Sequence, residues 1–373
     1  MRDRLRIRNA KSLPVRPRSR PRAGQAGALP RLPAGRWSRP RTGQAKGVAL
    51  IMVLWVIAIL SVVVLEFSFG MRTEANMTKN FKEEAYLYGL AEGGLHRAIA
   101  ELIYKHDPGV QQKRKAMKEN IPPEKEEWIT DGRPYLLPFG QGKGEVRVMG
   151  EDGKININMV SETFLRKIIG NMGLEEEARD VVVDSIMDWR DPDDLYRVNG
   201  AENDYYQSLA DPYYSKDGNL DSIEELLLVR GVTRDLFYGK MKKEDGKTER
   251  VGLKDIFSIY ASGEQIDMNS TSPLVMRMAL GIPGEVTRLI VKAREDKRFE
   301  NQQDLIQRVP EMSAFIGEIG RLIVYQPRSP YYTIESKARS QEAGSVRGLK
   351  AIVKIDGREK KGYKIIQWID AVW

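Results

Sequence analysis

Hydrophobic positions are concentrated in one stretch near the start of this 373-residue chain. From Val48 to Leu65, eighteen consecutive residues carry no charge. A helix of that length rises about 27 Å, which is close to the hydrocarbon thickness of a bilayer. We therefore predict a membrane-spanning helix over residues 48–70.

The helical pattern continues beyond this apolar run. Apolar side chains recur every three or four positions and define one stripe, made of Phe81, Ala85, Tyr88, Ala91, Leu95, Ala98 and Leu102. Asp107, Pro108 and Gly109 end the pattern. The sequence predicts one long helix from about Val48 to Lys105, whose second part offers a single apolar face to a folded body.

Alternating apolar and polar residues predict strands at both ends of that body. The predicted strands are 134–139, 145–150, 154–158, 331–337, 349–355 and 363–369. Asp152-Gly153 is typical of a hairpin turn, and Asp356-Gly357 indicates a second turn. Because the two groups of strands lie some two hundred residues apart, the helical region between them is an insertion.

The insertion contains a degenerate repeat. The segment 157–161 (INMVS) resembles 268–272 (MNSTS), and 225–232 resembles 304–310. The offset is 111 at the first pair and 79 at the second, so the first copy holds about thirty extra residues between Asp191 and Leu220. The repeated unit resembles the helix-hairpin-helix and SAM-like class, which often binds DNA through phosphates.

The amino-acid composition excludes several kinds of covalent, metal and catalytic site. The chain has no cysteine and two histidines, which excludes disulfides, thiolate zinc sites and a Cys nucleophile, and leaves little for a Ser-His-Asp triad. Residues 1–47 carry a net charge of +13, which leaves −5 of the total +8 for the rest. A basic arm followed by an acidic body argues against nucleic-acid binding by the folded part.

The junction between the basic arm and the apolar run carries the first family resemblance. Lys46, Gly47 and Val48 resemble the cleavage site of type IV prepilins and type II secretion pseudopilins. That resemblance implies that prepilin peptidase cuts after Gly47, that the new N-terminus at Val48 is methylated, and that the apolar helix is kept. A cleaved secretory signal is the alternative, but no small-residue site follows the apolar run. Most family members have Glu as the fifth mature residue, where this chain has Met52.

The most specific local pattern is acidic. DWRDPDD at 188–194, with NGAENDYY at 199–206, resembles the K-type minor pseudopilins. Because Pro192 and Asn199-Gly200 interrupt a helix, carboxylates from two turns can converge around a hard cation, and oxygen ligands favour calcium. The resemblance also implies calcium, and the candidate ligands are Asp191, Asp193, Asp194, Glu202 and Asp204. The alternative is a solvated acidic loop.

These observations predict an α+β protein with a pilin-like long N-terminal transmembrane helix packed on an antiparallel sheet, and a large inserted, duplicated helical domain. The predicted division is a basic leader (1–47), the transmembrane half-helix (48–70), the amphipathic half-helix (71–107), a connector with the first strands (108–160), two helical units (161–255 and 256–328) and the last strands (329–373). The basic arm places the N-terminus in the cytoplasm and the body in the periplasm.

The resemblance implies a structural role at the tip of the type II secretion pseudopilus, where the protein initiates assembly or caps the filament. The implied partners are the I-type and J-type minor pseudopilins, the major pseudopilin, prepilin peptidase and the inner-membrane secretion platform. Two rivals remain open. A membrane-anchored DNA-binding or uptake protein would use the helical repeat, and a tethered hydrolase would use the acidic loop; we expect no enzymatic activity, because the acidic residues cluster in one loop.

Overall fold

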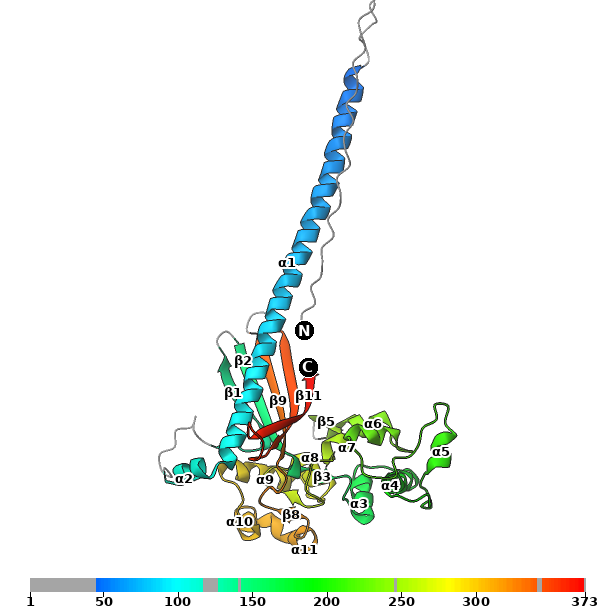
Figure 1. Cartoon of the computed structure of the whole chain (residues 1–373), viewed down its shortest axis with the longest axis vertical. Coiled ribbons are helices and arrows are strands. Elements are labelled where there is room, and N and C mark those ends of the chain that lie inside the picture. The colour runs from blue at the N-terminus through cyan, green and yellow to red at the C-terminus, as the bar shows by residue number, and fades with distance from the viewer. Residues whose placement is uncertain (1–44, 117–126, 140–141, 245–246, 341–343, 372–373) are drawn as a thin grey trace, which may run out of the picture. The chain divides into compact units, whose positions relative to one another are not determined.

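The computed structural model describes residues 45–116, 127–139, 142–244, 247–340 and 344–371. The chain divides into two compact units, Met1–Met71 and Arg72–Trp373. The predicted leader therefore lies outside the described residues, except for its last three positions. One helix, α1 (Ala45–His106), runs from the first unit into the second, as the sequence pattern predicts (Figure 1).

The second unit contains a five-stranded antiparallel sheet of order β1-β2-β9-β10-β11. The strands are β1 (Asp131–Phe139), β2 (Gly142–Gly150), β9 (Tyr331–Ser340), β10 (Val346–Ile355) and β11 (Tyr363–Ala371). β2 pairs directly with β9, with Val148 opposite Ile334. The sheet is therefore built from the two distant groups of strands predicted above, and the insertion leaves from β2 and returns to β9.

One face of the sheet packs against the second half of α1. Leu87, Ala91, Leu95, Ala98 and Leu102 are buried against apolar side chains of β2, β9 and β10. Together they form the core of the pilin-like body.

The predicted apolar stripe is wrong at its start. Phe81, Ala85 and Tyr88 are exposed, and the buried row begins at Leu87. Glu84 pairs with Arg347 of β10, but the apolar core between the helix and the sheet begins at Leu87. Apolar residues before that point have no apolar surface in this unit to pack against.

The predicted end of α1 is confirmed, an unpredicted helix follows it, and one predicted turn is wrong. Asp107 ends α1 but caps a second helix, α2 (Pro108–Ala116), because its Oδ1 accepts hydrogen bonds from the amides of Gly109 (2.8 Å) and Val110 (3.1 Å). Asp152-Gly153 does not form a hairpin turn. Residues Glu151–Gly153 form a 3₁₀ turn, η2, and the strand that follows leaves the sheet.

The insertion has its own core, made of short elements. They are β3 (Ile155–Asn156), α3 (Glu162–Asn171), α4 (Glu176–Arg190), α5 (Asn203–Gln207), η3 (Ile223–Leu228), α6 (Arg234–Tyr238), β4 (Lys240–Glu244), β5 (Lys247–Val251), α7 (Leu253–Ile256), β6 (Phe257–Ser258), β7 (Ile266–Asp267), α8 (Pro273–Met278), α9 (Gly284–Asp296), α10 (Gln302–Arg308), η4 (Pro310–Ala314), α11 (Ile316–Ile319) and β8 (Ile323–Val324). β3 pairs with β6, and β7 pairs with β8, both in parallel.

The two copies of the repeat use the same polar contacts. The Asn158 side chain donates to the Leu220 carbonyl (3.0 Å) and accepts from its amide (2.8 Å). Asn269 makes the same pair of bonds to Phe299, at 2.9 and 2.8 Å. These positions reproduce both offsets, 111 and 79, that the sequence indicates.

In each copy, one arginine near the end of the longer helix of that copy, α4 or α9, donates to two backbone carbonyls of the segment that begins the copy. In the first copy, Arg190 of α4 donates to the carbonyls of Ile157 and Val160. In the second copy, Arg294 of α9 donates to Met268 and Thr271, which stand at the corresponding positions. The insertion is therefore a duplicated module, held together at the same points in both halves.

Asp152 fixes the insertion to the sheet. Its buried carboxylate accepts hydrogen bonds from the amides of Ser262 (2.7 Å), Arg328 (2.5 Å) and Ser329 (2.6 Å). These donors come from the second half of the insertion and from the segment that leads into β9. Because three amides share one buried charge, the junction is held in a single arrangement.

Candidate functional site

The apolar half of α1 has the composition of a membrane segment. Its most apolar stretch has a mean hydropathy of 3.2, and it is the one span of this kind within the described ranges. Every large apolar side chain from Val48 to Leu65 is exposed. Ser61 satisfies its hydroxyl within the helix by donating to the Ile57 carbonyl (2.8 Å). This surface needs lipid or other apolar helices around it.

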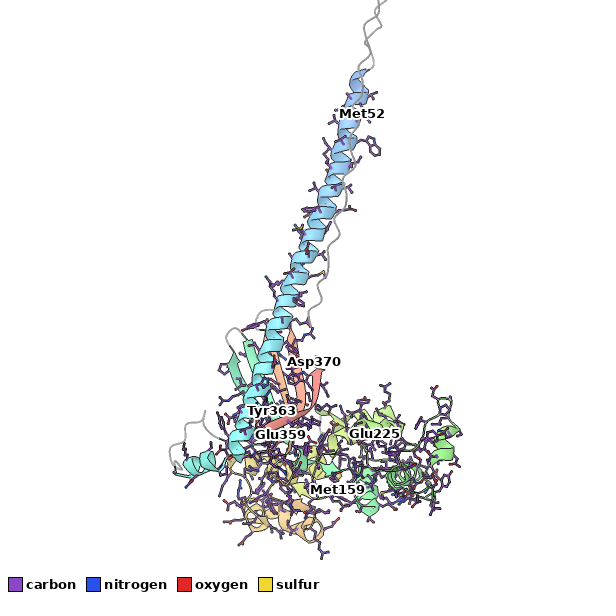
Figure 2. The ribbon with its side chains drawn as sticks, viewed as in Figure 1. Met52, Met159, Glu225, Glu359, Tyr363 and Asp370 are labelled. Atoms are coloured by element: carbon purple, nitrogen blue, oxygen red, sulfur yellow. The ribbon has the colours of Figure 1, made fainter. Side chains whose placement is uncertain are left out.

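The residues predicted to take part in leader cleavage and filament assembly lie at the start of this helix. α1 already includes Gly47 and Val48, so the predicted cleavage point falls within the helical span. Met52 is 59% exposed on the helix surface (Figure 2). Its thioether carries no charge, and the nearest carboxylate along the chain is Glu66.

The acidic segment between α4 and η3 is anchored by arginine and asparagine side chains. Arg197 donates to Asp188 (2.7 Å) and to Asp191 (2.6 Å). The backbone amide and the side-chain amide of Asn199 both donate hydrogen bonds to the Asp184 carboxylate, at 3.1 Å each. The segment is therefore an ordered structure built on the end of α4 and differs from a freely solvated loop.

Glu202 is the unusual group in this segment. The residue is 2% exposed, and neither carboxylate oxygen has a hydrogen-bond partner among the described residues. Burial raises its pKa to about 7, with further contributions from the charges of Asp188, Asp191, Asp217 and Asp194. A buried carboxylate without donors costs free energy unless a proton or a cation neutralises it.

The structure brings together only part of the predicted ligand set. The charges of Asp191 and Asp194 act on Glu202, whereas Asp193 and Asp204 are exposed and accept hydrogen bonds from nearby amides of their own turns. No group of His, Cys, Asp and Glu side chains in the described part of the chain is already arranged to hold a metal ion.

Sequence reasoning missed two carboxylates that act on Glu202. Asp188 shares a helix face with Asp184 and Asp191, a spacing of four and three that could have revealed it. Asp217 has a positive φ of 50° and is held to the segment by Asn203, whose side-chain amide lies 3.3 Å from Asp194 and 3.4 Å from Asp217.

The basic residues of the second copy are engaged within the protein. Arg294 is buried, Arg288 pairs with Glu285, Lys297 pairs with Glu300 (2.7 Å) and Arg298 lies 3.6 Å from Glu127. Arg288 and Lys297 face solvent, but each pairs with a neighbouring carboxylate, which opposes phosphate binding. The geometry therefore gives no support to the DNA-binding alternative.

Comparisons with known proteins agree on one family. The family model described as "Type II secretion system (T2SS), protein K" matches residues 148–240, which include the acidic segment. Type II secretion system protein K of Pseudomonas aeruginosa is 26% identical over 291 residues, covering 74% of this chain and 80% of that protein. The chain is similar to type II secretion system protein K. This similarity supports the role of a minor pseudopilin that the sequence predicts.

Other members and one solved structure extend the comparison. Type II secretion system protein K of Pectobacterium carotovorum is 25% identical over 210 residues, covering 52% of this chain and 60% of that protein. A chain in the crystal structure of the GspK-GspI-GspJ complex from enterotoxigenic Escherichia coli aligns with a TM-score of 0.52 and 14% identity, over 80% of this chain and 99% of that one. This likeness supports the fold of an α+β body with a long apolar helix.

Proposed function

We propose that this chain is a type II secretion protein K that forms or caps the tip of the pseudopilus and starts its assembly, acting as a structural subunit and not as an enzyme. The observation that carries the proposal is where the insertion joins the pilin-like body. His106, the last residue of α1, contacts Tyr332 at the start of β9 (3.2 Å), directly after the insertion ends. The insertion therefore occupies the end of the body where α1 terminates, and a subunit added beyond that end would collide with it.

The exposed apolar half of α1 supplies the contact to the rest of the filament. We propose that it first spans the inner membrane, with the basic residues 1–47 in the cytoplasm and the body in the periplasm. It then packs against the helices of the I-type and J-type minor pseudopilins and the major pseudopilin. The solved GspK-GspI-GspJ complex supports this choice of partners.

The start of the same helix would carry the site where the chain is processed. Prepilin peptidase would remove residues 1–47, and the new N-terminus at Val48 would be methylated before the secretion platform extracts the subunit. Because Met52 replaces the usual glutamate, this subunit offers no carboxylate to the N-terminal amine of a neighbour, which suits a first subunit more than one in the shaft.

A gold-labelled chain tests the tip position directly. The label should appear at one end of each pseudopilus, and Gly47→Ala should leave the leader attached and block secretion. N-terminal sequencing of the mature chain should begin at Val48. Labels distributed along the shaft, or normal secretion with the leader retained, would contradict the proposal.

We also propose that the acidic segment binds calcium. The donors are all carboxylate oxygens, and the unpartnered Glu202 is the group that most needs a cation. Glu202, Asp194 and Asp217 would hold the ion, with Asp188 and Asp191 adding negative charge. Bound calcium would neutralise these carboxylates and stabilise the segment.

Calcium titration of the thermal midpoint tests this assignment. We expect calcium to raise the midpoint more than magnesium does, and Glu202→Gln or Asp217→Asn to abolish the increase. Asp193→Asn and Asp204→Asn are matched controls that should retain it. An increase that survives Glu202→Gln, or that is lost only in the controls, would refute the ligand set.

A further inference from the structure

The two edges of the five-stranded sheet differ in how they are protected. β1 contains Pro134 and Pro138, and its register with β2 is interrupted between Asp131 and Pro134. Proline and register breaks are devices that stop a sheet edge from pairing with other chains. This edge is closed to further pairing.

The opposite edge, β11, also has a register shift, between Ile352 and Val353 of its partner β10, but it lacks proline. Its sequence, YKIIQWIDA, contains no proline and is rich in β-branched and aromatic residues. Within the described residues β11 pairs only with β10, so its outer backbone groups face away from the sheet. Ile366 and Ile369 are 36% and 37% exposed. A nine-residue edge of this kind can accept another strand.

The sheet face opposite α1 is basic. Residues alternate along each strand, so those between the buried positions share this outer face. On β2, β9, β10 and β11, seven cations stand there, namely Lys143, Arg147, Lys337, Arg339, Lys350, Lys354 and Lys364, and two carboxylates, Glu145 and Glu335. Asp131 of β1 is a third carboxylate on this face. A strand added beside β11 would meet Lys364 on this face, with Lys350 one strand further in.

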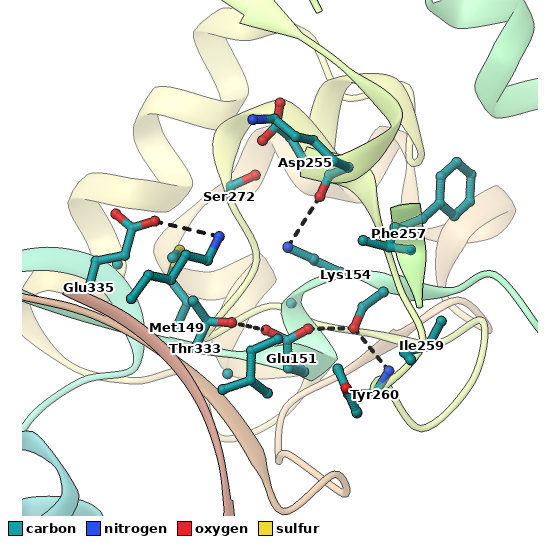
Figure 3. A pocket seen from close by; sticks show the side chains of 18 of the residues that line it. Met149, Glu151, Lys154, Asp255, Phe257, Ile259, Tyr260, Ser272, Thr333 and Glu335 are labelled. Carbon is teal, nitrogen blue, oxygen red and sulfur yellow. Dashed lines mark hydrogen bonds and ion pairs between the residues drawn. The ribbon is translucent and has the colours of Figure 1, made fainter. Parts of the chain in front are cut away.

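A cavity of about 900 Å³ lies between this outer face and the insertion (Figure 3). Ile366 and Ile369 of β11 line it, as does Lys350. Lys350 has one loose carboxylate partner, Glu335 at 3.8 Å, and Lys154 donates to a backbone carbonyl (3.3 Å). Burial and the charge of Lys154 lower the pKa of Lys350, so an incoming carboxylate would be favourable there.

The insertion's side of the cavity carries both charges. Asp221, Glu224 and Asp255 line that wall together with Lys254 and Lys154. Glu151, on the cavity floor, is already occupied, because its oxygens accept from the hydroxyls of Ser258 and Thr333 (2.6 Å for the latter). The positive charge next to the open edge comes from the sheet, through Lys364 and Lys350.

We infer that β11 is a docking edge for an extended segment of a partner protein whose side chains on the outer face alternate between carboxylate and apolar groups. The backbone of that segment would pair with β11. Its carboxylates would face Lys364 and Lys350, and its apolar side chains would cover Ile366 and Ile369. This inference goes beyond the tip function and does not depend on it.

The test uses the full chain in detergent micelles and a blocked nine-residue Val-Glu peptide of sequence Val-Thr-Glu-Thr-Val-Thr-Glu-Thr-Val. In an extended strand, one face of this peptide alternates between Val and Glu, and Thr fills the other face. Hydrogen exchange should slow at least tenfold in 363–371 on adding the peptide and remain unchanged in 131–139. Binding should weaken as salt rises. The corresponding Val-Lys peptide, with Lys in place of both Glu residues, should not bind.

A charge exchange separates docking from misfolding. The double variant Lys364→Glu, Ile369→Glu should lose binding of the Val-Glu peptide at least tenfold and gain binding of the Val-Lys peptide. Leu136→Glu, on the exposed face of β1, is the matched control and should bind as the parent does. The inference is overturned if both peptides bind equally, if β1 is protected instead, if neither peptide protects β11, or if β11 becomes protected by self-association alone.

Discussion

The close contact between α1 and the sheet depends on Gly94. A Cβ placed at this position would collide with the Ser336 hydroxyl and would lie 2.9 Å from Val146 Cγ2. Ser336 and Val146 are register partners on β9 and β2, so both strands meet the helix at this point. Gly93, the preceding residue, has open space around a built Cβ within the described part of the chain.

The two glycines therefore form a matched pair for Gly→Ala substitution. Both gain about 1 kcal/mol from helix propensity, because each lies inside α1. Gly94→Ala also overpacks the contact with Ser336 and Val146, which costs about 1–3 kcal/mol. We expect Gly93→Ala to stabilise the chain by about 1 kcal/mol and Gly94→Ala to be about 1–3 kcal/mol less stable than Gly93→Ala.

Urea unfolding of a chain that starts at Arg72 measures this difference, since both clusters of buried residues lie after that point. A second substitution tests the cause. Ser336→Ala removes the colliding hydroxyl and leaves its Cβ 3.6 Å away, so Gly94→Ala should cost less in the Ser336→Ala background. Equal stability of the two single variants, or strict additivity in the double variant, would refute the packing argument.

Three further substitutions test the junction, the duplicated module and a buried charge. Asp152→Ala should cost at least about 3 kcal/mol, because the buried amide of Ser329 and two others lose a charged acceptor; wild-type urea stability would refute this. Asn269→Ala should cost about 2–4 kcal/mol by leaving the Phe299 amide and carbonyl unpaired, and a loss under 1 kcal/mol would contradict the role of Asn269. Burial and the charge of Arg298 lower the pKa of Lys105 in the folded chain to about 8. Between pH 8 and 9.5 the unfolded chain therefore binds more protons than the folded chain does. The free energy of unfolding should rise over this interval by up to about 2 kcal/mol. Lys105→Met should flatten that rise, and an unchanged slope would show that another group causes it.

Periodicity predicted the elements whose partners are extended and regular. The long helix, the five sheet strands and the position of the insertion all follow from spacings of two, three and four residues. The predicted apolar stripe was wrong at Tyr88, because periodicity indicates which face of a helix is apolar but not where the surface that covers this face begins. Leu87 and Tyr88 are neighbours, and only the position of the sheet decides which of them is buried.

Short elements held by distant partners could not be predicted in the same way. The segment after Gly153 alternates like a strand, yet Ile155 pairs with Phe257, about one hundred residues further along the chain. The acidic segment shows the same limit. Sequence reasoning found Glu202 and Asp194 but not Asp217, because the side chain of Asn203 joins these segments and local spacing does not reveal that contact.

The duplication explains how an acidic segment could grow in one copy without disturbing the fold. In the second copy, five positions separate Arg294 from Phe299, whereas thirty separate Arg190 from Leu220 in the first. Both ends of each connection are fixed by the same contacts, the arginine to two carbonyls and the asparagine to one backbone amide and carbonyl. Lengthening a loop whose ends are already held costs little, since closure entropy grows only with the logarithm of length. The first copy could therefore acquire its carboxylates while the module kept its core, and Asp194→Asn or Asp217→Asn should weaken the proposed calcium response more than it disturbs the packing of α3 and α4.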